Sequence, residues 1–171
     1  KGVQESISYI NGEIYSKPVT RMKFLLASGG GDVGAGVNLY TYLKALPIDV
    51  ETIGFGEVDA AATLVFLGGK SRIAVTDCQF FFHEGRYTIH DHIAPVHTHE
   101  EAISVFKREL QHMIHIISSE TNNDSEVVAT MLRKSKIMHA AEAQEFGLVH
   151  HIVTKLPLKQ QEERGFGFGP K

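Results

Sequence analysis

Two glycine-containing segments have residue types and a spacing that could bind an anion. Residues 28–33 read SGGGDV and residues 54–62 read GFGEVDAAA. A strand that turns through glycine into a helix leaves backbone N–H groups at the positive end of the helix dipole, where they can hold an oxyanion. For the glycines alone, a tight turn without a ligand stays open as the alternative. The spacing matches neither a P-loop nor a dinucleotide fingerprint.

The second segment has the form of a turn that presents a nucleophile in a hydrolase, but it carries no nucleophile. Alanine, Ala60, occupies the start of the expected helix, so from the residues alone this is a packing helix. His83 ends an apolar run and becomes a general-base candidate only where a nucleophile lies within hydrogen-bond reach. Otherwise it is a structural histidine at a strand end.

A histidine cluster raises the alternative of a metal site. It consists of His90, His92, His97 and His99. Two histidines separated by one residue on a strand place both rings on one face, as a zinc or other transition-metal site requires. Pro95 and the polar surroundings favour a solvated loop over residues 84–97 instead. We therefore expect no metal ion and no cofactor.

Length and composition favour one ordinary globular domain. At 171 residues, 43% hydrophobic and 22% charged, the chain can bury a sufficient core without a disulfide or metal. We expect one domain over residues 1–158 and a low-complexity, disordered tail over residues 159–171, which contains GFGFGP.

Charge and cysteine content exclude several classes of partner. Lys and Arg number 17 against 20 Asp and Glu, with no basic block, so nucleic acid is not expected as a partner. No apolar run approaches 18 residues, so no membrane span or export signal is expected. The single Cys78 suits a reducing compartment, and we expect a cytoplasmic location.

Short β-rich runs alternate with amphipathic ones, which predicts an α/β fold. Strands are expected at residues 6–10, 22–27, 50–55, 72–75, 79–83 and 148–154. Helices are expected at residues 33–46, 60–67, 98–120, 124–133 and 140–145. Between the first two strands, residues 11–21 are too few for an ordinary parallel crossover, which indicates an unusual connection or a lost helix.

The helix expected at residues 98–120 is the longest. Thr98 and Glu101 have the spacing of a capping box at its start. Its predicted inward stripe has helical periodicity and consists of Ile103, Phe106, Leu110, Met113 and Ile117.

The order and spacing of four segments resemble the proteolytic subunit of the Clp protease, the ClpP family. The segments are SGGGDVGAGVNLYTYLK, TIGFGEVDAAATLVFLGGKSRIA, CQFFFHEG and MHAAEAQEFGLVHHI. The corresponding family pattern reads S-P-G-G-x-V-x-A-G, G-x-A-A-S-x-G, x-x-H-Q-P and S-A-x-E-A-x-E-Y-G-L-I-D. The resemblance implies the ClpP/crotonase fold: stacked ββα units with helices outside and a long protruding handle helix.

The resemblance also assigns roles to five positions. Gly31 and Ala61 would supply the two N–H groups of an oxyanion hole, and His83 would be the general base. Ala60 stands where the family has its nucleophilic serine, and Ser135 stands at the position of the family's aspartate. Without a serine Oγ there is no acyl-enzyme route, so the chain as written is inactive as a serine peptidase.

Three explanations of Ala60 stay open. It is an introduced knock-out, a natural loss in a pseudo-peptidase that acts as a scaffold, or the mark of a lineage with another task. Survival of His83 and the glycine turn favours a knock-out or a recent loss.

The resemblance further implies a polypeptide substrate, assembly into homo-oligomeric rings that are often stacked in pairs, and an AAA+ ATPase that unfolds and feeds the substrate. The long helix and the His-rich loop would make the contact between rings. A non-catalytic structural or adaptor subunit of such a ring is the alternative function. A crotonase-like enzyme acting on acyl-CoA thioesters is a further alternative, since it uses the same paired N–H oxyanion hole.

Overall fold

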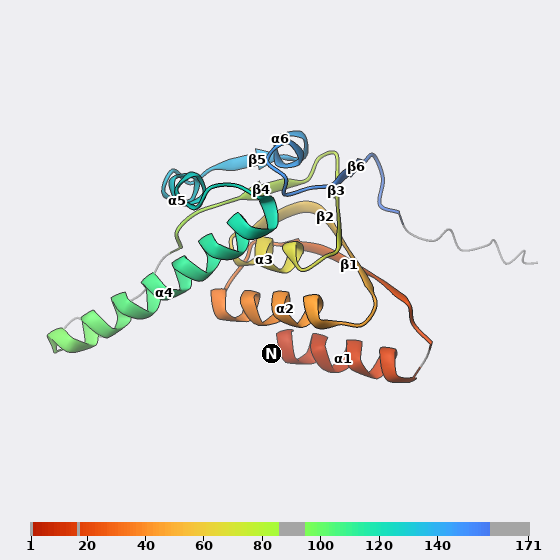
Figure 1. Ribbon diagram of the computed structural model, residues 1–171, viewed down its shortest axis with the longest axis horizontal. Coiled ribbons are helices and arrows are strands. Elements are labelled where there is room, and N and C mark those ends of the chain that lie inside the picture. Colours follow the sequence, from red (N-terminus) through yellow and green to blue (C-terminus); the bar gives the residue numbers. More distant parts are fainter. Residues whose placement is uncertain (1, 17, 86–94, 158–171) are drawn as a thin grey trace, which may run out of the picture.

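The computed structural model of the chain describes residues 2–16, 18–85 and 95–157. Its helices are α1 (Gly2–Ser16), α2 (Val33–Ala45), α3 (Ala61–Leu67), α4 (Val96–Thr121), α5 (Ser125–Arg133) and α6 (Ala140–Glu145). Its strands are β1 (Arg21–Ser28), β2 (Asp49–Asp59), β3 (Ser71–Val75), β4 (Gln79–Phe81), β5 (Ile137–His139) and β6 (His151–Val153). In Figure 1, α1, α2 and α3 lie on one side of the sheet, whereas α5 and α6 lie near its opposite side.

The sheet is curled and mostly parallel, and β2 is its central strand. The strand order is β5-β4-β2-β3-β6, with β1 paired to β2 as well. The first part of β2 pairs with β1 and β3, and its last three residues pair with β4. Gly56, at φ 67°, lies where β2 changes its partner from β3 to β4. Beyond Gly56 the end of β2 pairs with β4, and both strands end at the candidate site.

The N-terminal segment is a helix, so the strand expected at residues 6–10 is wrong. Ile7, Ile10 and Ile14 recur at helical spacing and belong to the apolar cluster that also contains Leu39 and Leu43 of α2. The alternating pattern over five residues was too short to distinguish a strand from this longer helical period. The supposed short crossover at residues 11–21 is therefore the end of α1 and a turn, and no crossover helix is missing.

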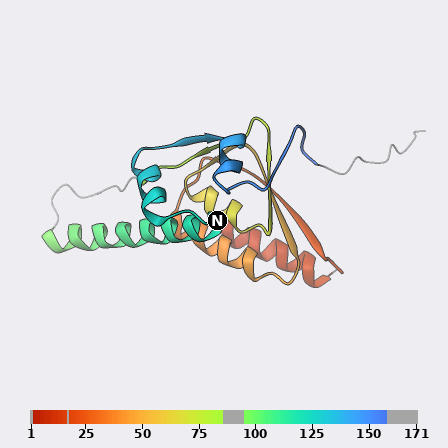
Figure 2. The ribbon, with the colours of Figure 1, turned by 45° about the horizontal axis from the view of Figure 1, so that its top comes forward.

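Helix α4 begins earlier than expected and projects from the domain. Pro95 is its N-cap residue and supplies no side-chain hydrogen bond, so the capping box at Thr98 is wrong. Because the helix starts at Val96, Thr98 lies inside its first turn, where its N–H donates to the carbonyl of Pro95. The C-terminal half packs more closely on the domain: Met113 and Ile117 are buried, whereas Ile103 in the N-terminal half is 41% exposed. Figures 1 and 2 both show the N-terminal half extending beyond the rest of the molecule.

The other expected elements are present with shifted ends. Strands β4 and β6 are shorter than expected, and β5 was not expected at all. Phe66 of α3 and Phe80 of β4 are fully buried, with ring centroids 5.1 Å apart. The expected tail and most of the expected His-rich loop fall on residues 158–171 and 86–94, outside the described residues. Among the helices of the described ranges, none is both long and apolar enough to cross a membrane.

Candidate active site

The turn between β2 and α3 has a backbone conformation that is unusual for alanine. Ala60 has φ 46° and ψ −119°. Its N–H donates to the carbonyl of Phe81 at 2.8 Å, and its carbonyl accepts from the N–H of Thr63 at 3.0 Å. A non-glycine residue in this region costs on the order of 1–3 kcal/mol and persists where the surroundings impose it, as they do at functional sites. The turn is thus an elbow that presents residue 60.

The glycine turn after β1 packs directly against this elbow. A Cβ atom on Gly30 would lie 2.7 Å from the carbonyl oxygen of Asp59 and 3.3 Å from the nitrogen of Ala61, so glycine is required there. Gly30 and Gly31 have φ values of 91° and 144°. The N–H of Ala61 belongs to the first turn of α3, where helix geometry supplies no intrahelical acceptor. The sequence therefore brings two segments some thirty residues apart to one place where N–H groups can bind an anion.

His83 follows β4 and lies next to the elbow. Its Nδ1 accepts a hydrogen bond from the N–H of Gly85 at 2.9 Å. Its ring packs against Phe81, with centroids 4.9 Å apart and planes at 36°. In a neutral ring, an accepting Nδ1 leaves the proton on Nε2. His83 must therefore exchange its bond to Gly85 for a contact with an acceptor before Nε2 can take up a proton.

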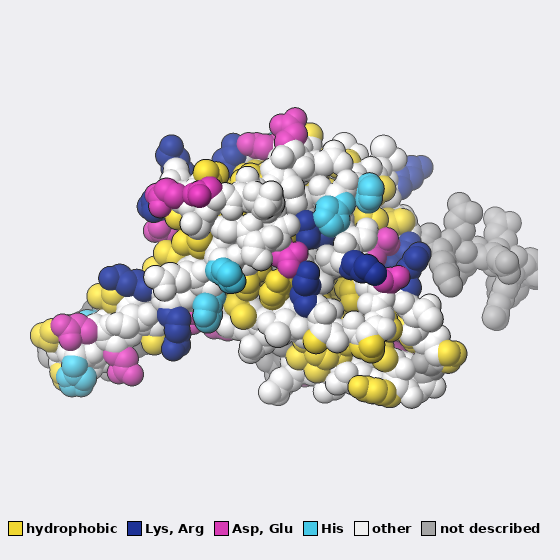
Figure 3. Space-filling view, in the orientation of Figure 1, with side chains coloured by type: hydrophobic (Ala, Val, Ile, Leu, Met, Phe, Trp, Pro, Cys, Tyr) yellow, Lys and Arg dark blue, Asp and Glu magenta, His cyan; other side chains and the backbone are white. Residues whose placement is uncertain are grey.

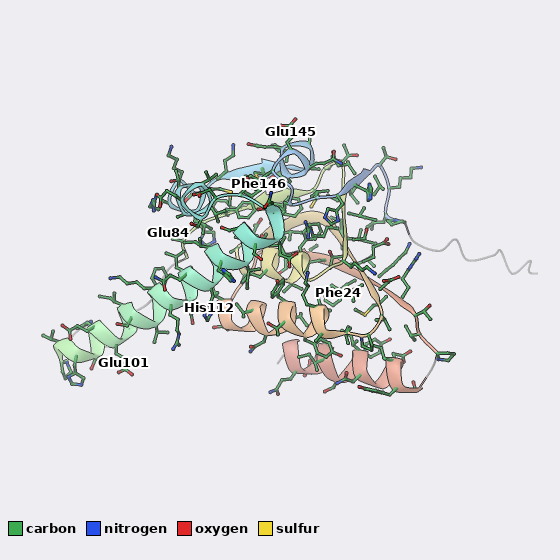
Figure 4. All side chains as sticks on the ribbon, in the orientation of Figure 1. Phe24, Glu84, Glu101, His112, Glu145 and Phe146 are labelled. Atoms are coloured by element: carbon green, nitrogen blue, oxygen red, sulfur yellow. The ribbon has the colours of Figure 1, made fainter. Side chains whose placement is uncertain are left out.

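Two cavities meet at His83. One, of about 520 Å³, is lined by Gly31, Ala60 and His83 and is closed on the far side by α4. The other, of about 330 Å³, is lined by His83 and Ser135. Glu84 lines both, between α4 and α5 (Figure 4). The structure thus places Ala60 and Ser135 on opposite sides of the histidine.

Ser135 and Ala61 lie outside the cavity that Gly31, Ala60 and His83 line. Ser135 follows the C-cap residue of α5, has φ 50° and is exposed. Because Phe81 pairs with Ile137 in antiparallel register, two further residues along each strand bring His83 opposite Ser135. Ala61 does not line the cavity that holds Ala60 and His83; it lines an adjacent cavity with Gly30 and Gly31.

Asp59 is a polar residue of the site that was not anticipated. Its Oδ1 accepts a hydrogen bond from the N–H of Phe81 at 3.1 Å. Burial raises the pKa of its carboxyl group above the usual value, and this effect exceeds the opposing effects of the Phe81 N–H and of His83. A signal was available in the sequence: Asp59 is an acidic residue that directly precedes Ala60, the start of the apolar segment of residues 60–67.

The metal alternative gains no support from the part of the chain that the structure describes. Within residues 2–16, 18–85 and 95–157, no three His, Cys, Asp or Glu side chains are grouped as ion ligands. His97 and His99 lie in the first turn of α4, and His97 is exposed. His90 and His92 lie outside the described residues.

Comparison of folds defines the class of protein. The chain superimposes on a mutant ClpP1 from Listeria monocytogenes with a TM-score of 0.75, at 19% identity, covering 89% of this chain and 84% of the other. It superimposes on a peptidase from Plasmodium falciparum with a TM-score of 0.72, at 20% identity, covering 90% and 89% of the two chains. The curled sheet with its projecting helix is therefore the ClpP fold.

Comparison of sequences then gives the family. The sequence model of Clp protease matches residues 8–156, so the chain belongs to the Clp protease family, a family of peptidases. The proteolytic subunit 2 of the ATP-dependent Clp protease of Treponema pallidum is 28% identical over 159 residues. That alignment covers 91% of this chain and 76% of the relative.

Proposed function

We propose that this chain is a Clp-type serine peptidase subunit whose active site lacks the nucleophile. The observation that carries the proposal is the elbow at Ala60, which keeps a strained backbone conformation although alanine presents no reactive atom. Gly31 and His83 line the same cavity. Such strain has no use in a turn that serves packing alone, whereas it suits a side chain that must be held toward a substrate.

With serine at position 60, each group has a defined role. The serine Oγ would attack the peptide carbonyl, while His83 Nε2 would take its proton and then give it to the leaving amine. The N–H groups of Gly31 and Ala61 would stabilise the oxyanion. Water would then attack the acyl carbonyl while His83 takes its proton, and His83 would return that proton to the serine Oγ as the ester bond breaks. Ser135, opposite His83, would orient the ring from its hydroxyl.

A second function is favoured by two observations: Ala60 itself and the bond that the N–H of Gly85 donates to His83 Nδ1. Both suit a non-catalytic structural subunit that assembles beside active subunits. Membership of the Clp protease family favours either peptidase-related role over an acyl-CoA enzyme.

The proposal extends to assembly and location. We propose homo-oligomeric rings, stacked in pairs, that enclose the cavity and receive polypeptide from an AAA+ ATPase in the cytoplasm. The projecting half of α4 would contact the opposite ring, because its apolar side chains Val96 and Ile103 are exposed on the single chain. In Figure 3, hydrophobic side chains appear among charged ones along this arm.

The test is labelling of the Ala60→Ser variant with a fluorophosphonate, which reacts with an activated serine. We expect labelling of Ala60→Ser and a loss of at least a hundredfold in its rate in the double variant Ala60→Ser/His83→Ala, since a general base contributes about 10²–10⁴-fold. A folded Ala60→Ser protein that is not labelled would contradict the peptidase proposal and favour the structural subunit.

A further inference from the structure

We infer that Asp59 and Phe81 form a clamp that positions His83 relative to residue 60, an inference that rests on the proposed function. Asp59 is the last residue of β2 and Phe81 the last of β4, and the two are paired in parallel register. The clamp links the elbow to the histidine through Phe81. Neither clamp residue is assigned a catalytic step.

The first part of the clamp is a pair of hydrogen bonds on the backbone of Phe81. Its N–H donates to Asp59 Oδ1 at 3.1 Å, and its carbonyl accepts from the N–H of Ala60 at 2.8 Å. Both polar backbone groups of Phe81 are therefore bonded to two consecutive residues of the elbow. A shift of Phe81 relative to Ala60 must break at least one of these bonds.

The second part is the contact between the rings of Phe81 and His83. Residues two apart along an extended segment project to the same face, and these two rings lie 4.9 Å apart. The intervening Phe82 is fully buried, and its N–H donates to the carbonyl of Lys136 at 2.8 Å. The segment is thus held on the elbow side by Asp59 and on the β5 side by Lys136, which restricts where the His83 ring can lie.

The carboxyl group is a costly way to satisfy one backbone N–H. Burial raises the pKa of Asp59, which means that its ionised form is destabilised in the folded chain. The family pattern G-x-A-A-S-x-G has alanine directly before the nucleophile, where this chain has Asp59. A polar group that costs stability beside a site is typical of a residue with a positioning role.

The test compares Asp59→Ala with Asp59→Asn in the Ala60→Ser background. We expect Asp59→Ala to lower the second-order rate of fluorophosphonate labelling by about tenfold, the effect of one lost hydrogen bond on a transition state. Asp59→Asn recovers most of the rate, because its amide oxygen accepts the same bond. With a peptide substrate the loss falls on kcat, while KM stays within about twofold.

Two further variants test whether the effect on labelling comes from a nearby charge or from the ring of Phe81. Glu57→Gln removes an exposed charge two residues away on the same strand and should leave labelling unchanged. Phe81→Leu keeps both backbone bonds and removes the ring, and should slow labelling as Asp59→Ala does. Equal rates in Asp59→Ala and its Ala60→Ser parent would overturn the clamp, as would a slow Asp59→Asn that matches Asp59→Ala.

A readout in the Ala60 chain keeps the clamp distinguishable from the proposed function. If Ala60→Ser is not labelled, the proposed function fails, and the imidazole ¹H–¹⁵N spectrum of His83 decides the clamp alone. Asp59→Ala should shift or broaden the His83 signals and speed hydrogen exchange of the Phe81 amide, whereas Asp59→Asn should do neither. Unchanged His83 signals in a folded Asp59→Ala protein would overturn the inference.

Discussion

Gly36 and Gly12 both lie within helices, but the effect of replacing each by alanine depends on what surrounds it. A Cβ atom on Gly36 would lie 2.7 Å from the backbone carbonyl of Ala61, whereas one on Gly12 would have nothing within 4 Å. We expect Gly36→Ala to force α2 from α3 and to lower the free energy of unfolding by about 1–3 kcal/mol. Gly12→Ala should raise it by about 0.5–1 kcal/mol, since alanine is the better helix former.

Urea unfolding of both variants at neutral pH checks these opposite signs. In the Ala60→Ser background, Gly36→Ala should also slow labelling, because the displaced residue supplies an oxyanion N–H in the proposed site. A Gly36→Ala protein as stable as its parent would show that the two helices separate without cost.

At the same scale, the order of the motifs in the sequence predicted which residues line one cavity, but not the hydrogen bonds that position them. Gly31, Ala60 and His83 line one cavity, as their order in the family pattern implies. The contribution of Asp59 was missed because it depends on the N–H of Phe81, twenty-two positions away, which only strand pairing brings near. The bond at His83 Nδ1 likewise depends on the local turn to Gly85, for which residue types carry no signal.

At the scale of elements, a buried ion pair joins the end of α4 to β3 and α2. Arg72 is 4% exposed and donates to Glu120 Oε2 at 3.2 Å. Tyr40 and Lys44 of α2 donate to Glu120 Oε1 at 2.7 and 2.8 Å. Burial would raise the pKa of Glu120, but the bonds from Lys44 and Tyr40 and the charge of Arg72 hold it below the usual value. Burial raises the pKa of Tyr40 to about 12, and Glu120 adds to the shift.

We expect Glu120→Gln to lower the free energy of unfolding by about 3 kcal/mol at pH 7, because it leaves the charge of Arg72 buried without a counter-ion. The control Glu126→Gln breaks a pair with Arg133 whose side chains are 76% and 50% exposed, and should change stability by less than about 1 kcal/mol. Equal effects of the two substitutions in urea unfolding would contradict the assignment.

The pH dependence of stability provides an independent check of the same network. Since folding lowers the pKa of Glu120 below the usual value of 4.5, its stabilisation is present above pH 4.5 and is lost as pH falls through the folded-state pKa. Since folding raises the pKa of Tyr40 from 10.0 to about 12, stability falls as pH rises between these values. We expect urea unfolding at a series of pH values to show that Glu120→Gln loses less stability than the parent at acid pH. Tyr40→Phe should lose less stability than the parent at alkaline pH. Unaltered profiles would contradict the two assignments.

The helices and strands were predicted well where apolar residues recur over a long segment or where glycine lies at the end of the element. Helices α2 and α3 and strand β1 lie close to their expected positions, since glycine or apolar runs bound each. Helix α1 was mistaken for a strand because five alternating residues matched both periods. The apolar cluster that Ile7 and Ile14 share with Leu39 and Leu43 of α2 decided between them. Strand β5 has three residues and exists through its pairing with β4, which no local pattern encodes.

At the scale of the whole molecule, the spacing of apolar residues predicts that α4 has an apolar face, but it does not predict which part of the molecule covers that face. The stripe from Ile103 to Ile117 was expected to face inward along its whole length, yet the domain covers only its C-terminal part. Ile103 and Val96, seven residues apart, share one side of the projecting half and remain exposed in the single chain. An apolar surface on an arm that extends from the domain (Figure 2) fits a contact with another copy of the chain.

We therefore expect Ile103→Glu to weaken assembly while leaving the fold intact. Its side chain is already 41% exposed, so a charge there costs little in the single chain but places an unpaired carboxylate in an apolar contact. Sedimentation velocity should show a smaller species for Ile103→Glu than for the parent, with an unchanged thermal midpoint at a concentration where both are dissociated. Arg108→Glu, which changes charge on the other side of the helix, should keep the size of the parent. The same large assembly in Ile103→Glu and in the parent would mean that this face of α4 is not the contact, and a monomeric parent would contradict the proposed assembly.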